Sequence, residues 1–199
     1  MRTVSAILDA GAQVFVRVGY DRATTARIAE RAGVSVGSFY QYFPSKDAVL
    51  VALSERHVGQ SHATLDRALQ TLETGAPVSL DEIVRTLVRA LLDAHAASPR
   101  LHRLLSEHAP RIAQLGAKKE ASDRELLVRA EALIARAPQA RSSRVRAAVA
   151  MVARVLESLT HWYVIDAPDI GVDEPAFIEE VTALACGCLS SRPDGGVTR

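Results

Sequence analysis

The fold is decided by residues 24–43, TTARIAERAGVSVGSFYQYF. Thr24 or Thr25 can cap a short helix, because a hydroxyl accepts a hydrogen bond from an unpaired N–H group of the first turn. Gly33 can end that helix in the left-handed conformation, and Ser35 can cap a second short helix after it. Two short helices joined by a tight turn are typical of a helix-turn-helix, whose second helix enters the major groove of DNA.

The second of these helices has a core-facing side and a polar, aromatic side. With Phe39 and Phe43 turned toward the core, the residues on or beside the opposite face are Gly37, Ser38, Tyr40, Gln41 and Tyr42. Glycine costs up to about 1 kcal/mol in a helix interior relative to alanine, so stability alone does not explain this face. Gly37 would let the backbone approach a DNA strand closely.

Chemistry suggests a role for each residue of this predicted surface, to which Ser35 also belongs. Ser38 and Gln41 can hydrogen-bond to base edges, and Val36 can touch a thymine methyl group. Other side chains carry hydroxyls or a cation suited to phosphate oxygens; they are Thr24, Thr25, Tyr40, Tyr42 and Lys46. Arg27 can reach either a phosphate or a base. In the alternative, which stays open, the tyrosines pack against the first helix of the chain and the threonines only cap.

The rest of the chain also shows helical spacing, so we expect an all-α protein of about nine helices. A first helix ends at Gly19, and a fourth runs from Ser45 to about Leu72. Later helices are expected to begin near Ser79 and Ser98, to include residues 126–134, and to cover about 142–163 and 173–189. No convincing alternation of period two predicts a strand.

Composition places few limits on function. The chain has 199 residues, of which 48% are hydrophobic and 24% are charged, enough for one or two domains. Its apolar runs are too short to span a membrane, and its first residues lack a signal-peptide pattern, so we expect a cytoplasmic protein. The net charge is +1. The excess of basic residues between 22 and 46 suits a local phosphate contact, and a solvated helix face explains it equally well.

Taken in order, the N-terminal residues resemble the DNA-binding domain of the tetracycline-repressor (TetR) family over about the first 55 positions. The matching residues are Ile7-Leu8-Asp9-Ala10, Phe15, Gly19-Tyr20, Thr24-Thr25, Ile28-Ala29, Ala32-Gly33-Val34-Ser35, Gly37, Phe39-Tyr40, Tyr42-Phe43 and Ser45-Lys46. Two departures are chemically small: Ser38-Phe39 stands where Thr-Leu is commoner, and Asp47 where Glu is. The resemblance implies a three-helix DNA-binding domain over 1–56 and a larger helical ligand-binding and dimerisation domain over 57–191. We expect the tail 192–199 to be disordered.

The resemblance also implies a homodimer, in which helices 142–163 and 173–189 form a four-helix bundle with those of a second copy. Both helices carry apolar or small residues on more than one face, which favours more than one packing partner. A two-fold dimer would place two recognition helices about 34–36 Å apart on a pseudo-palindromic operator in double-stranded DNA.

A small-molecule effector is implied by the resemblance, and the sequence does not identify it. The best candidates for its pocket are His95 and His108, on helices that flank the pocket in the family, and Trp162, which could equally lie in the dimer interface. Each is, taken singly, more often a surface or core residue. We expect no cofactor and no metal, because no histidine pair has the His-Glu-x-x-His form and Cys186 and Cys188 would point to nearly opposite sides of a helix.

Together these features predict a sequence-specific DNA-binding transcriptional regulator, and most simply a repressor that a small molecule releases from its operator. An effector bound among helices 79–137 would act by shifting the fourth helix, which is continuous with the DNA-reading part. An enzyme is not expected, because the chain has no phosphate-binding glycine loop and no nucleophile elbow. The alternative is a helical small-molecule- or partner-binding protein that keeps the helix-turn-helix only as scaffold. The intact set of Thr24, Thr25, Tyr42 and Lys46 speaks against it.

Overall fold

The computed structural model describes residues 2–76, 78–108, 113–140, 145–167 and 169–190, with only the backbone at 113–122 and 145. Within these ranges the chain is helical, apart from an isolated bridge between Ala140 and Ser190, which confirms the all-α prediction. The elements are α1 (Arg2–Val18), α2 (Thr25–Ala32), α3 (Val36–Tyr42), α4 (Lys46–Thr74), α5 (Leu80–Ala96), α6 (Pro99–His108), α7 (Ala113–Arg136), α8 (Val145–His161), the π-helical η2 (Trp162–Asp166) and α9 (Glu174–Leu189). The tail 192–199, expected to be disordered, lies outside the described residues.

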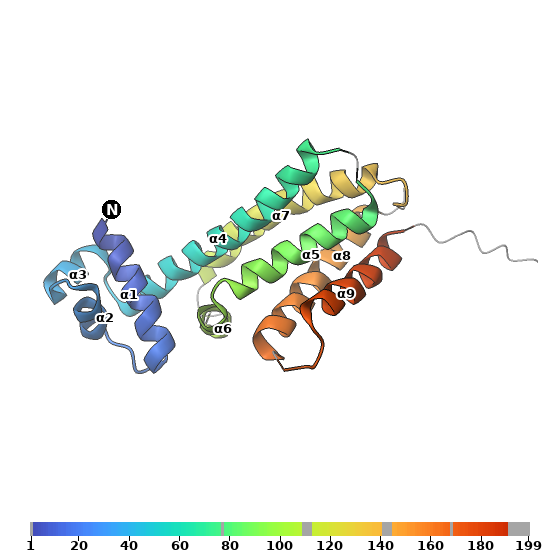
Figure 1. Ribbon diagram of the computed structural model, residues 1–199. Helices are drawn as coiled ribbons and strands as arrows, with labels where there is room; N and C mark the ends of the chain where they lie inside the picture. Colours follow the sequence, from blue (N-terminus) through green and yellow to red (C-terminus); the bar gives the residue numbers. More distant parts are fainter. Residues whose placement is uncertain (1, 77, 109–112, 141–144, 168, 191–199) are drawn as a thin grey trace, which may run out of the picture. The chain divides into compact units, whose positions relative to one another are not determined.

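The chain forms two compact units (Figure 1). Unit 1 contains residues 1–60 and 98–120, and unit 2 contains residues 61–97 and 121–199. The helix α4 contributes residues to both. The predicted first domain, residues 1–56, is shorter than unit 1, which also includes α6 and the first residues of α7. Leu104 and Leu105 of α6 are buried in the same core as α1, a pairing that sequence order does not reveal.

The core of unit 1 fixes the helix-turn-helix against α1 and the first half of α4. Its fully buried side chains are Ile7, Phe15, Ile28, Ala29, Phe39, Val49 and Leu53. Gly11 of α1 lies where helices approach closely, since a Cβ there would be 2.6 Å from Cγ1 of Val49. The single buried aromatic of α3, Phe39, therefore holds the recognition helix in place while its other side stays at the surface.

In unit 2, α5 packs against α8 and α9, which also pack against each other (Figure 1). The hydroxyl of Ser79 accepts a hydrogen bond from the Glu82 amide and caps α5, as the sequence predicts. The Asp173 carboxylate caps α9 in the same way. The Tyr163 ring stacks on Phe177 with centroids 4.0 Å apart, which joins η2 to α9. Burial, and to a lesser extent the nearby carboxylates, raise the pKa of Tyr163. No helix in the described part of the chain is long and apolar enough to cross a membrane.

Candidate nucleic-acid interface

The N-terminus of α2 presents a hydroxyl beside backbone donors. Thr24 is extended, with φ −127° and ψ 154°, and its Oγ1 accepts a hydrogen bond from the Arg27 amide at 3.3 Å. The predicted cap is therefore confirmed. The Thr24 hydroxyl keeps its own hydrogen, which can be donated to a phosphate oxygen next to the first-turn N–H groups that no helix pairs.

A left-handed glycine makes the turn between α2 and α3. Gly33 has φ 68°, a conformation that favours glycine, and its amide donates to the Glu30 carbonyl at 3.1 Å. The next amide, of Val34, donates to the Ala29 carbonyl at 3.0 Å. These two hydrogen bonds pair carbonyl groups at the end of α2. Because α3 begins only two residues after Val34, the connection is the tight turn that a helix-turn-helix requires.

The outer face of α3 is free for an external partner. Ser35 caps the helix by accepting from the Ser38 amide at 3.0 Å. The exposed residues of α3 are Val36, Gly37, Tyr40, Gln41 and Tyr42, and Ser38 is half-buried. A Cβ on Gly37 would be 3.8 Å from Ser35 Oγ, an ordinary contact, so no neighbour within the protein demands glycine there. Because Gly37 has no side chain, the backbone of α3 can come close to another molecule at this position.

The hydroxyls of Thr25 and Tyr40 are joined across the motif by a hydrogen bond of 3.0 Å. The Tyr40 ring also meets Phe39 edge-on, with centroids 5.5 Å apart. Tyr40 therefore packs in part, against α2 and its own helix, and still exposes about half of its surface. One hydroxyl hydrogen of the pair is used internally, and the other can be donated to a phosphate oxygen.

The Arg27 side chain is exposed and only partly used within the protein. Its Nη1 donates to the Arg22 carbonyl at 3.1 Å, and Arg22 in turn donates from Nε to the Val18 carbonyl at 2.8 Å. A guanidinium has five N–H donors, so Arg27 keeps several for an external acceptor.

The Lys46 side chain, suggested by the sequence as a phosphate ligand, makes several contacts within unit 1. Its ammonium donates to the carbonyls of Tyr20, Asp21 and Ala23 at 2.9, 3.2 and 3.2 Å, and lies 4.4 Å from the Tyr20 ring centroid. An ammonium has three N–H donors, so a phosphate contact would require these bonds to be exchanged. The Tyr20 hydroxyl donates to Asp47. The sequence did not indicate this Tyr20 cluster, because its members lie 26 or 27 positions apart and share no local spacing.

The three candidates for an effector pocket are divided between the two units. His95 is buried on α5, with its ring centroid 5.6 Å from that of His161. Trp162 begins η2 and is partly exposed. His108, however, belongs to unit 1, where its ring centroid lies 4.8 Å from that of Tyr20 and its Nδ1 bonds the Leu104 carbonyl at 2.9 Å. This ring contact across the chain could not be read from helix order.

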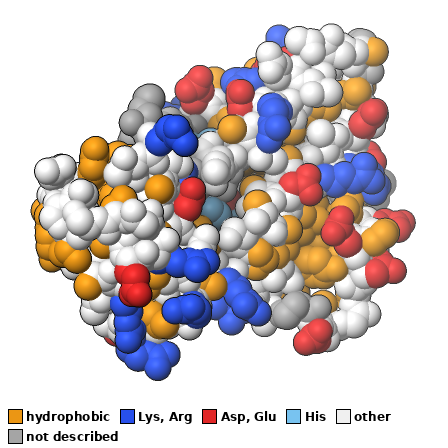
Figure 2. Space-filling model, turned by 60° about the vertical axis from the view of Figure 1, so that its left-hand side comes forward, with side chains coloured by type: hydrophobic (Ala, Val, Ile, Leu, Met, Phe, Trp, Pro, Cys, Tyr) orange, Lys and Arg blue, Asp and Glu red, His pale blue; other side chains and the backbone are white. Residues whose placement is uncertain are grey.

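Large apolar side chains also lie at the surface of α8 and α9. On α8, Met151, Val155 and Trp162 just beyond its end follow helical spacing and are exposed. On α9, Leu184 and Cys188 are exposed. The buried residues of this helix are Phe177, Ile178, Val181, Thr182, Ala185 and Leu189, so Leu184 lies outside the buried face. Hydrophobic side chains form patches among charged ones on the surface shown in Figure 2.

Comparison with known families gives two matches, one in the N-terminal part of the chain and one in the C-terminal part. Residues 7–53 match the family described as bacterial regulatory proteins, tetR family. Residues 79–189 match the tetracyclin repressor-like C-terminal domain. The first match contains the whole of α2 and α3, and the second runs from the cap of α5 to the end of α9.

Individual relatives agree with these matches. The transcriptional activator FasR of Mycolicibacterium smegmatis is 31% identical over 193 residues, covering 94% of this chain and 83% of FasR. The transcriptional repressor KstR of the same organism is 40% identical over 86 residues, covering 43% of this chain and 41% of KstR. The solved structure of a tetR-family regulatory protein from Rhodococcus RHA1 covers 97% of this chain and 100% of its own, with a TM-score of 0.73 and 19% identity. This last likeness shows the fold.

Proposed function

The chain belongs to the TetR family of bacterial regulatory proteins and is a DNA-binding transcriptional regulator, and we propose that it binds a pseudo-palindromic operator as a homodimer that a small-molecule effector releases. One observation carries the proposal. Phe39 fixes α3 from inside while Val36, Tyr40 and Tyr42 stay exposed on its outer face. Exposed aromatic rings on a rigid helix of this motif are suited to a partner that supplies phosphates and base edges.

Two kinds of contact divide this face. Gln41 and Ser38 would make hydrogen bonds to base edges, and Val36 would meet a thymine methyl group. The hydroxyls of Thr24 and Tyr42 would donate to phosphate oxygens, which position the protein without specifying sequence. Lys46 would have a structural role instead, because its three hydrogen bonds to backbone carbonyls hold the turn before α2 against the start of α4.

The exposed apolar face of α8 and α9 would be buried against the same face of a second copy. Met151, Val155 and Leu184 are aliphatic, and such a face gains free energy when another apolar face covers it. A two-fold interface uses the same patch on both copies, and the resulting dimer presents two α3 helices to successive major grooves. The protein would act in the cytoplasm, where chromosomal DNA lies.

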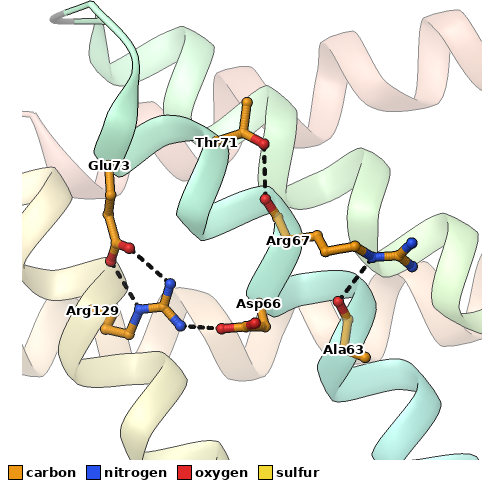
Figure 3. A network of polar contacts seen from close by, with 6 residues as sticks. All are labelled: Ala63, Asp66, Arg67, Thr71, Glu73 and Arg129. Carbon is orange, nitrogen blue, oxygen red and sulfur yellow. Dashed lines mark hydrogen bonds and ion pairs between the residues drawn. The ribbon is translucent and has the colours of Figure 1, made fainter.

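The helix α4 would transmit effector binding, because it contributes residues 46–60 to unit 1 and residues 61–74 to unit 2. Its second part is tied to α7 by Arg129, which bonds Asp66 and both carboxylate oxygens of Glu73, the latter at 2.8 Å (Figure 3). An effector that binds unit 2 can release DNA only if it binds the two states of the dimer with different affinities. We propose that the protein represses transcription and that the effector weakens its binding to DNA. Activation would result if the effector strengthened DNA binding instead.

The test starts from DNA that the purified protein selects from a random library. Tyr42→Ala should weaken binding to every selected sequence and reduce the salt dependence, whereas Gln41→Ala should chiefly change which bases are preferred. Compounds are then screened for release of the complex. If the protein selects no sequence at moderate salt, the helix-turn-helix is only a scaffold and the proposed function is wrong.

A further inference from the structure

A groove of about 470 Å³ lies between α4 and α5 in unit 2. Four residues of each helix line it: Thr64, Arg67, Ala68 and Thr71 from α4, and Thr86, Arg89, Ala90 and Asp93 from α5. Within each set the spacing is i, i+3, i+4 and i+7, which places the four side chains on one helix face. The volume is within the range of about 300–1,000 Å³ that small-molecule sites occupy.

The two walls of the groove have nearly the same sequence. Residues 64–69 read TLDRAL and residues 86–91 read TLVRAL. The second leucine of each, Leu69 and Leu91, is buried in the core of unit 2, so the Thr-Arg-Ala face of each helix is turned to the groove. An alanine at the middle of each wall leaves the space between the arginines unfilled.

The arginines of the groove have no acidic partner in the described residues. The Arg67 guanidinium donates to its own helix, to the Ala63 carbonyl at 3.1 Å and to Thr64 Oγ1 at 3.3 Å. Neither Arg67 nor Arg89 forms an ion pair with any described carboxylate, although Asp93 lies in the lining. The groove thus holds two cations and one anion.

The acidic residues of α4 next to Arg67 are already used elsewhere. Asp66 and Glu73 both bond Arg129 of α7, and Figure 3 shows Arg67 extending away from that network. The hydrogen bond from Arg129, the largest influence, lowers the pKa of Glu73, which keeps this carboxylate charged and paired. Neither Asp66 nor Glu73 is therefore available as a partner for Arg67.

We propose that this groove is a binding site for a phosphate-bearing small molecule, held between Arg67 and Arg89. A planar guanidinium binds phosphate oxygens through two parallel N–H donors, and the threonine hydroxyls can donate to the remaining oxygens. A bound anion also removes the repulsion between two like charges that face one groove. The site goes beyond the proposed function, since it requires neither operator binding nor a particular effector.

The test is calorimetric titration of the full chain with pyrophosphate, which offers two anionic groups. The expected result is saturable binding of one pyrophosphate per chain. Arg67→Gln and Arg89→Gln should each weaken it at least tenfold, because each removes a charge-assisted contact. Arg85→Gln is the matched control, since Arg85 lies one turn before Arg89 on α5 and bonds Asp81 at 3.2 Å. It removes the same charge and should change the affinity less than twofold.

Three outcomes would overturn the proposal. They are no saturable binding by the wild-type chain, an equal loss in all three variants, and weakened operator binding by Arg67→Gln without any pyrophosphate binding, which would make the groove a DNA contact. Circular dichroism checks that each variant is folded. If a glutamine variant does not fold, the double variant Arg67→Lys, Arg89→Lys keeps both charges and replaces the planar fork. It should also bind at least tenfold more weakly.

Discussion

Two surfaces of the molecule expose large side chains to the same extent and differ in what these side chains end in. On α3, Tyr40 and Tyr42 are 52% and 47% exposed; on α8 and α9, Val155 and Leu184 are 46% and 53% exposed. The first pair ends in hydroxyls, and the second consists of hydrocarbon alone. Exposure therefore marks both surfaces as candidate interfaces. The polarity of the side-chain ends distinguishes them, because hydroxyls are suited to phosphates and hydrocarbon is suited to a second copy of the chain.

The same substitution on the two surfaces should have opposite effects, and this is the largest effect we expect. Leu184→Arg places a charge where the dimer would be dry, so the protein should become monomeric. Operator affinity should then fall about a hundredfold or more, since only one half-site is held. Sedimentation gives the mass, and a DNA mobility shift gives the affinity.

Tyr42→Arg is the matched control for that change. It adds a cation where phosphates would lie, so the protein should stay dimeric and bind DNA at least as tightly, with less sequence preference and a steeper salt dependence. A dimeric Leu184→Arg variant would contradict the role given to α8 and α9. A Tyr42→Arg variant that lost all DNA binding would contradict the phosphate role of the α3 face.

The sequence predicted what depends on neighbouring residues. The caps at Thr24, Ser35 and Ser79 are confirmed, because a hydroxyl and the amide three residues later are local partners. It did not predict that α6 joins unit 1. That depends on which core buries the helix, and helical spacing indicates an apolar face but not the element that packs against it.

Lys46→Ala tests whether this residue is a structural or a DNA-binding group. The bonds of its ammonium to three backbone carbonyls lead us to expect a loss of about 2–3 kcal/mol in the stability of unit 1, because hydrogen bonds to charged groups contribute about 1.5–3 kcal/mol. Thermal unfolding measures this loss. Unchanged stability with a salt slope reduced by about one would instead make Lys46 a phosphate ligand, as the sequence predicted.

Two equivalent helix caps, one in each unit, allow a comparison in which the expected loss of stability is smaller. Thr24 and Ser79 accept from the amide three residues later at 3.3 and 3.2 Å. Either alanine variant should lose about 1 kcal/mol of stability. Only Thr24→Ala should also weaken DNA binding beyond that loss, because only α2 points its N-terminus at phosphates in the proposed complex. Equal operator affinity in the two variants, corrected for the folded fraction, would remove Thr24 from the interface.

The smallest effect we expect is a difference between the units in their response to acid. Burial lowers the pKa of His57 in unit 1 below its ordinary 6.5, and its Nε2 bonds His102 Nδ1 at 2.7 Å. In unit 2 the bond from Arg129 lowers the pKa of Glu73 below its ordinary 4.5. In both cases the unfolded chain binds the proton more readily, so the stabilisation is complete above the ordinary value and is lost as the pH falls toward the lowered one.

Unit 1 should therefore lose the His57 contribution as the pH falls below about 6.5, and unit 2 should lose the Glu73 contribution below about 4.5. Hydrogen exchange of the backbone amides, read separately for α1 and α5, measures the two losses. His57→Gln keeps a polar side chain without a titrating group, so it should flatten the first loss and leave the second unchanged; Glu73→Gln should do the reverse. If α1 is equally protected at pH 5.5 and 7.5 in the wild-type chain, the burial of His57 does not control the acid sensitivity of unit 1.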